Sequence, residues 1–100
     1  MLIWVPVEER IEKESKIAKV MEAKAWALIN FDAGIIQSIE FYDRREDFND
    51  FADFIILENK FENFMEYMNE GLVVLSVRDE RTIDEIIEAF KFKELDEVGF

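Results

Sequence analysis

The chain has 100 residues, a formal net charge of −12, and neither cysteine nor histidine. This length fits one domain, and an apolar content of 50% is enough for a packed core. The missing residue types exclude disulfides, metals ligated by thiolate or imidazole, and histidine-based catalytic triads. The 24 acidic and 12 basic side chains disfavour nucleic acid and anionic membranes as partners, because both attract cationic proteins.

The longest uncharged runs, among them 1–7 and 25–31, are far shorter than the ~20 apolar residues that span a bilayer. No basic stretch of the kind that opens a signal peptide precedes the first run. We therefore expect a cytoplasmic protein. The acidic excess is confined to 25–100, since residues 1–24 are neutral overall.

The first quarter of the chain predicts one strand and one short helix. Residues 2–7 are an apolar run too short for a helix, which predicts a strand buried on both faces. Residues 8–14 are charged and predict a loop. Ser15 is a suitable N-cap, so the spacing of apolar side chains after it predicts a short helix over 15–22.

The second quarter predicts a β-hairpin. Residues 25–31 and 35–42 are two strand-like runs, and the segment between them ends in Gly34, which tolerates a positive φ. The acidic segment 43–53 follows and predicts no more than one or two helical turns.

The second half predicts two units of a strand followed by a helix. Residues 54–57 predict a buried strand, and Asn59 with Glu62 forms a capping-box pattern for a helix that Gly71 would end. Residues 72–77 predict the fifth strand. A second capping box, Thr82 to Glu85, precedes helical spacing of Ile83, Ile86, Ile87 and Phe90, and 96–100 predicts a loose tail.

Consecutive strand–helix units imply parallel strands joined by right-handed crossovers, while the hairpin adds an antiparallel pair. The sequence therefore predicts a single α/β domain over 1–100, with three layers built on a mixed five-stranded sheet.

Several segments carry a family resemblance. They are Met-Leu-Ile-Trp-Val-Pro-Val at 1–7, Glu-Ser-Lys-Ile-Ala at 14–18, the Gly34 hairpin with Ser-Ile-Glu at 38–40, and the runs 71–74 and 82–90. In this order they resemble the dinitrogenase iron–molybdenum cofactor biosynthesis family, of the NifX and NifB C-terminal type. The resemblance implies a ribonuclease H-like fold with strand order 3-2-1-4-5 and strand 2 antiparallel. It also implies binding or carriage of iron–molybdenum cofactor or its precursors.

Three departures fall on the family's ligand-facing segments. Where the family commonly has x-His-Phe-Gly-Arg, residues 19–23 read Lys-Val-Met-Glu-Ala, so Val20 stands at the implied metal-binding histidine. Where the family has a Gly-Gly-x-Gly turn, residues 58–61 contain no glycine, and 43–53 is shorter than the family's loop and helix. These departures predict a retained scaffold that has lost cofactor binding.

If a ligand site exists, the fold predicts its place. In doubly wound sheets, ligands bind at the carboxyl ends of the parallel strands. Glu8, Asn59, Lys60 and Arg78 follow those ends here and are the candidate cofactor-binding residues. Lys60 and Arg78 could receive a small anion, as could the cluster Lys16, Lys19 and Lys24. The alternative is that Asn59 is only a helix cap and the charges are solvated.

Catalysis is not predicted. Ribonuclease H-type chemistry needs acidic side chains on the strands, and the first strand offers none over 2–5. The acidic run 43–53 lacks the spacing and central glycine of a calcium loop. We predict no catalytic residue, no metal site and no cofactor.

An aromatic-rich stretch leaves two interpretations open. Its members are Phe48, Phe51, Phe54, Phe61 and Phe64. They are either core residues or an exposed patch where 43–53 fails to cover one sheet face, and such patches mark partner surfaces. The second interpretation predicts a non-catalytic protein acting through contacts with an unknown protein partner or as a homodimer. The alternative function is a carrier that binds a metallocofactor or small anionic ligand at the strand ends.

Overall fold

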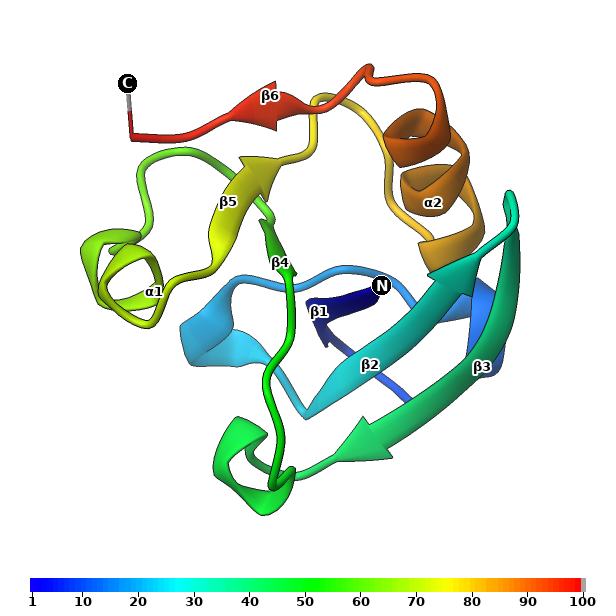
Figure 1. Cartoon of the computed structure of the whole chain (residues 1–100), viewed down its shortest axis with the longest axis horizontal. Coiled ribbons are helices and arrows are strands. Elements are labelled where there is room, and N and C mark those ends of the chain that lie inside the picture. The colour runs from blue at the N-terminus through cyan, green and yellow to red at the C-terminus, as the bar shows by residue number, and fades with distance from the viewer. Residues whose placement is uncertain (100) are drawn as a thin grey trace.

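The computed structural model describes residues 1–99, which form a mixed α/β fold around one six-stranded sheet (Figure 1). The strand order is β3-β2-β1-β4-β5-β6. Pairing makes β1, β3, β4 and β5 parallel to one another, with β2 and β6 antiparallel. The strands are β1 (Leu2–Val7), β2 (Ala25–Asp32), β3 (Ile35–Tyr42), β4 (Phe54–Leu57), β5 (Val73–Ser76) and β6 (Asp96–Glu97). The α-helices are α1 (Met65–Asn69) and α2 (Ile83–Lys91), and neither is long enough to cross a membrane.

The sheet has six strands rather than the predicted five. Residues 96–97 were expected in a loose tail, but they pair with Leu75 and Ser76 as β6. The backbone N–H of Val98 then donates to the carbonyl of Val74 at 3.0 Å. Leu95 and Val98, which directly precede and follow this strand in sequence, are both buried, and their burial holds the segment against β5. Phe100, the end of the predicted tail, lies outside the described residues.

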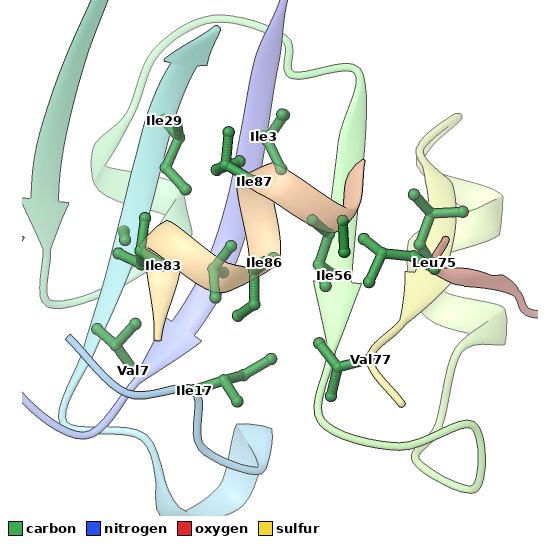
Figure 2. Close-up of a cluster of buried hydrophobic side chains, with 14 of the residues drawn as sticks. Ile3, Val7, Ile17, Ile29, Ile56, Leu75, Val77, Ile83, Ile86 and Ile87 are labelled. Atoms are coloured by element: carbon green, nitrogen blue, oxygen red, sulfur yellow. The ribbon is translucent and has the colours of Figure 1, made fainter. Parts of the chain in front are cut away.

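Helix α2 covers one face of the sheet. Alternate residues of each strand point to this face, and their aliphatic side chains meet Ile83, Ile86 and Ile87 of α2 (Figure 2). The capping box predicted at its start is confirmed, because Thr82 Oγ1 accepts from the Glu85 N–H and the Glu85 carboxylate accepts from the Thr82 N–H.

The opposite face is covered by α1 and by a 3₁₀ turn, η3 (Arg45–Asp47). The helix predicted to begin at Asn59 is wrong, since α1 begins only at Met65. Gly71 ends it as predicted, with a φ of +89° and a bond from the Leu72 N–H to the Tyr67 carbonyl at 3.1 Å.

The helix predicted over 15–22 is also wrong. Two 3₁₀ turns, η1 (Glu12–Glu14) and η2 (Val20–Glu22), flank an extended stretch in which Ile17 bridges to Val7. Ser15 is fully buried and its Oγ accepts from the Ile11 N–H at 2.7 Å, so it caps a turn before it rather than a helix after it.

The predicted hairpin is confirmed as β2 and β3. Its two-residue turn places Ala33 at φ +53° and Gly34 at φ +78°, the paired positive values that match the twist of the strands. A bulge at Asn30 and Phe31 shifts the register near the turn. Segment 43–53 contains a single 3₁₀ turn, within the predicted limit.

Candidate functional site

Strands β1, β4 and β5 end at one edge of the sheet, where three long connections gather. These connections are 8–24, 58–64 and 77–82. The first and third are held together by a bond from the Ile17 N–H to the Arg81 carbonyl at 2.7 Å. This edge is where the fold predicts a ligand site.

A groove at this edge lies between η2 and the segment leading into α1. It encloses about 780 Å³. Val20 and Tyr67 supply apolar walls, while Met21 and Phe61 stand at its sides with 98% and 86% of their surfaces exposed. The other lining residues are Lys19, Glu22, Glu62, Asn63 and Glu66. We call this feature the Met21–Phe61 groove.

Glu62 fixes the two sides of the groove relative to each other. One carboxylate oxygen accepts from the Val20 N–H at 2.7 Å and the other accepts from the Glu58 N–H at 3.2 Å. Glu62 was predicted to cap a helix begun by Asn59, and instead it ties the connection after β1 to the connection after β4. A carboxylate with both oxygens bound to backbone donors holds them firmly, since charged hydrogen bonds are the stronger kind.

Glu58 concentrates negative charge at the end of β4. The pKa of Glu58 is lowered by a hydrogen bond from Asn59 Nδ2, against an opposing effect of burial, and then by the ion pair with Arg81 at 3.2 Å. The Lys19 ammonium adds a smaller effect in the same direction. The carboxylate therefore stays charged and partly neutralises the cations at this edge.

Lys60 and Arg78 lie at the predicted edge but do not converge on one free pocket. Arg78 pairs with Asp96 at 2.8 Å, and its hydrogen bond to that carboxylate raises its pKa. Lys60 lines a depression together with Asp96 and Glu97, and its ammonium lies 5.7 Å from the centre of the Phe61 ring. An anion approaching Lys60 would meet two carboxylates.

Asn59 and Glu8 occupy local turn positions at the same edge. The Asn59 side-chain oxygen accepts from the Phe61 N–H at 2.8 Å, an Asx-type turn. Glu8 is exposed, and its backbone N–H donates to the Lys16 carbonyl at 2.8 Å. Their role in ligand binding stays a prediction.

A second cluster, on the α1 face, was missed from the sequence. The Arg45 guanidinium lies 5.3 Å from the Trp26 ring centre and 4.8 Å from that of Tyr67. Its two terminal nitrogens donate to the Glu70 carboxylate at 2.8 and 2.9 Å, which raises the pKa of Arg45 and lowers that of Glu70. Burial raises the pKa of Tyr67. No spacing signal links Arg45 to aromatic residues so far apart in sequence.

The aromatic-rich stretch contains both exposed and partly buried side chains, so each of the two predicted interpretations applies to some of its members. Phe51 and Phe61 are exposed, at 87% and 86% of their surfaces. The partly buried members, which pack against the two cores, are Phe48, Phe54 and Phe64. Of the five, Phe61 flanks the Met21–Phe61 groove.

The donor atoms at the groove do not fit an iron–sulfur or iron–molybdenum cluster. Such clusters are held mainly by thiolate or imidazole, and the chain has neither. Within residues 1–99, no three acidic side chains come together in a way that could hold a metal ion. The one soft donor at the groove is the Met21 thioether.

Segments 19–23 and 58–61 carry two of the three departures from the family pattern described above. The structure brings them together across the groove. They belong to the connections 8–24 and 58–64, which follow the neighbouring strands β1 and β4. The adjacency of these strands in the predicted topology was the signal that could have located the groove.

No known family model and no curated protein matches the sequence. Solved structures do match its fold. The crystal structure of PH0822 is 17% identical, with a TM-score of 0.73, covering 97% of this chain and 96% of that one.

Two further solved structures are similar. A "putative dinitrogenase" from Methanocaldococcus jannaschii has a TM-score of 0.70 at 14% identity, covering 99% of this chain and 95% of that one. A "putative NifB protein" from Thermotoga has a TM-score of 0.68 at 20% identity, with coverage of 99% and 95%. Identities this low show a shared fold and nothing more, over nearly the whole length of each chain.

Proposed function

We propose that this chain is a non-catalytic cytoplasmic protein of the dinitrogenase cofactor-biosynthesis type, with a ribonuclease H-like fold, that acts by contacting another protein through the Met21–Phe61 groove. The sequence resemblance and the descriptions of the structural neighbours support the type. The order of β1 to β5, with β2 antiparallel, supports the fold assignment.

The exposed side chains of Met21 and Phe61 carry the proposal. Methionine and phenylalanine are enriched at protein interfaces, where they supply large apolar contact area. Here both stand almost fully exposed beside a groove whose two sides are tied together by Glu62. A groove with two apolar tips beside it is suited to receive an apolar side chain of a partner.

Loss of cofactor binding is the second half of the proposal. Val20 lies in the groove at the position of the family's implied histidine, and an aliphatic side chain offers no lone pair to a metal. The alternative, a carrier that uses Glu8, Asn59, Lys60 and Arg78, is less well supported because Arg78 is already paired with Asp96.

Site-specific photo-crosslinking tests the protein contact. A photoreactive phenylalanine analogue at position 61 should give a discrete adduct in cells, either with a second copy or with another protein. The same analogue at Phe92, which is also exposed, should not give that adduct. Met21→Asp should abolish the adduct at position 61. Equal adducts from both positions would contradict the proposal.

Anaerobic reconstitution tests the cofactor half separately. The purified protein, incubated with iron, sulfide and molybdate and then desalted, should retain only traces of metal and show no visible absorption. A coloured protein with stoichiometric iron or molybdenum would favour the carrier function. Lys60→Gln and Arg78→Gln would then locate that site.

A further inference from the structure

An apolar cavity lies at the other end of the sheet, where β4 and β5 begin. It encloses about 530 Å³, within the range of small-molecule sites. Its apolar lining includes Phe31, Phe54, Phe90, Val73, Leu75 and Leu95. The ring centre of Phe90 lies 4.9 Å from that of Phe54 and 5.8 Å from that of Phe31, both edge-to-face. We call it the three-phenylalanine cavity.

The cavity exists because α2 is short. The helix ends at Lys91, and the sheet continues beyond it on the same face. Leu75 is buried there, whereas Val73, two residues earlier on the same strand and face, is 46% exposed. Helix α2 therefore covers the aliphatic core but leaves the three phenylalanine rings at its end accessible.

Two lysines line the same cavity, and one of them occupies an unfavourable backbone position. Lys93 has a φ of +59°, the left-handed region that favours glycine. It ends α2 in a Schellman arrangement, with the Glu94 N–H donating to the Ala89 carbonyl at 2.9 Å and its own N–H to the Phe90 carbonyl at 3.2 Å. A non-glycine residue held in such a conformation is a reason to look for a function of its side chain.

Basic side chains outnumber acidic ones around the cavity, although the chain as a whole is acidic. Acidic residues outnumber basic ones two to one in the sequence, yet Lys91 and Lys93 face a single acid, Glu97, in this lining. Cationic groups beside an aromatic floor complement a ligand that is apolar along its body and anionic at one end.

We propose that the three-phenylalanine cavity binds an apolar carboxylate, with the hydrocarbon body against Phe31, Phe54 and Phe90 and the carboxylate beside Lys91 and Lys93. This site is independent of the Met21–Phe61 groove, which lies at the opposite end of the sheet. Either site can therefore fail its test without affecting the other.

A titration followed by amide chemical shifts tests the proposal, with octanoate and octylammonium as probes of equal chain length and opposite charge. Octanoate should shift the amides of Val73, Phe90 and Leu95 and bind more tightly than octylammonium. A net charge of −12 favours the cation over the whole surface, so the reverse preference requires cations at the cavity, which are the two lysines and the Met1 ammonium. Tighter binding of octylammonium, or shifts confined to another region, would overturn the proposal.

Lys93→Gly separates the side chain's role from its effect on the fold. Glycine relieves the positive φ, so the melting temperature should rise while octanoate affinity falls by about two- to fivefold, as expected for one exposed charge pair. Lys24→Gln removes the same charge at the opposite end of the sheet and should leave affinity unchanged. Unchanged octanoate affinity in Lys93→Gly would contradict the site.

A second copy of the chain is the competing occupant of the cavity. Sedimentation equilibrium without ligand should give the same mass for Val73→Asp as for the unmodified protein. A dimer that Val73→Asp dissociates would show that the cavity is closed by another copy, and would overturn the ligand site.

Discussion

The two faces of the central sheet are covered in different ways. On the α2 face, a nine-residue helix packs its buried isoleucines against aliphatic side chains at alternate positions of the strands. On the α1 face, a five-residue helix and a 3₁₀ turn cover Trp4, Trp26 and Tyr42, and a guanidinium completes the packing. Burial of apolar side chains alone accounts for the packing of the α2 face, whereas the packing of the α1 face also includes the charged Arg45 guanidinium.

This difference indicates which parts of the surface are open to a ligand or a partner. The α2 face forms the main aliphatic core, and the three-phenylalanine cavity opens on this face. The α1 side borders the Met21–Phe61 groove through Tyr67, which also packs against Arg45. Changes to the aromatic face should therefore reach the groove, while changes to the aliphatic core beneath α2 should lower stability without altering the groove.

The largest effect is expected from truncating the aliphatic face. Ile86 is fully buried beneath α2, so Ile86→Ala removes apolar contacts and leaves a cavity that close neighbours cannot fill. We expect a loss of about 2–5 kcal/mol in the free energy of unfolding, measured by urea denaturation. Ile35→Ala, at a 60% exposed position on the edge strand, should cost less than about 0.5 kcal/mol. Equal losses would mean that the α2 face is not the main core.

A smaller loss is expected on the aromatic face. Arg45→Ala removes a cation from between two rings and leaves Glu70 without its partner, so we expect a loss of about 2 kcal/mol. The change should also weaken crosslinking at position 61, because Tyr67 lines the groove. The measurements are urea denaturation followed by tryptophan fluorescence, and adduct yield.

Glu70→Ala separates the ion pair from the ring contacts of Arg45. It breaks the ion pair but keeps the guanidinium between Trp26 and Tyr67. It should cost less than Arg45→Ala, since the Glu70 carboxylate is 42% exposed and an ion pair open to solvent contributes only about 0.2–1 kcal/mol. If the two variants lose the same stability, the ring contacts contribute nothing.

The same contrast explains which parts of the fold could be predicted from sequence. The hairpin and α2 follow from alternation, turn chemistry and a capping box, all of which are local signals. The order of the first five strands was implied by the family resemblance, not by these signals. The helices predicted at 15–22 and from Asn59 were wrong because Ser15, Asn59 and Glu62 bind backbone groups outside any helix. Side chains that cap helices also cap turns, and only the tertiary partner decides between the two.

The sequence predicted the location of the candidate site better than it predicted the residues that line it. Neighbouring strand ends located the edge, and Glu8, Asn59, Lys60 and Arg78 do lie along it. The exposure of Met21 and Phe61 was not predictable, because helical spacing would have placed Phe61 in the core. The strand β6 was missed since two residues carry no period, and its pairing depends on the burial of Leu95 and Val98.

Removing the N-cap of α2 should have an intermediate effect on the aliphatic face. Thr82→Ala leaves the Glu85 N–H without its acceptor, while the Glu85 carboxylate still accepts from the residue 82 N–H. We expect a loss of about 1 kcal/mol, measured by thermal or urea unfolding. Thr82→Ser keeps the hydroxyl and should retain most of the stability. A loss in Thr82→Ser equal to that in Thr82→Ala would show that the methyl group, not the cap, is responsible.

The smallest predicted effect is the pH dependence of the aromatic face. The hydrogen bonds from Arg45 lower the pKa of Glu70, so the pair stabilises the fold above the unfolded pKa of about 4.3 and the stabilisation is lost as the pH falls through the folded value. Glu70→Gln should therefore show a weaker loss of stability than the unmodified protein between about pH 5 and 3, by a few tenths of a kcal/mol given the exposure of the carboxylate. Acidification also relieves repulsion within a chain of charge −12, but both proteins share that effect, so the difference between their urea midpoints isolates the pair. In an Arg45→Ala background, Glu70→Gln should no longer change the pH dependence, and a persisting change would assign the lowered pKa to a group other than Arg45.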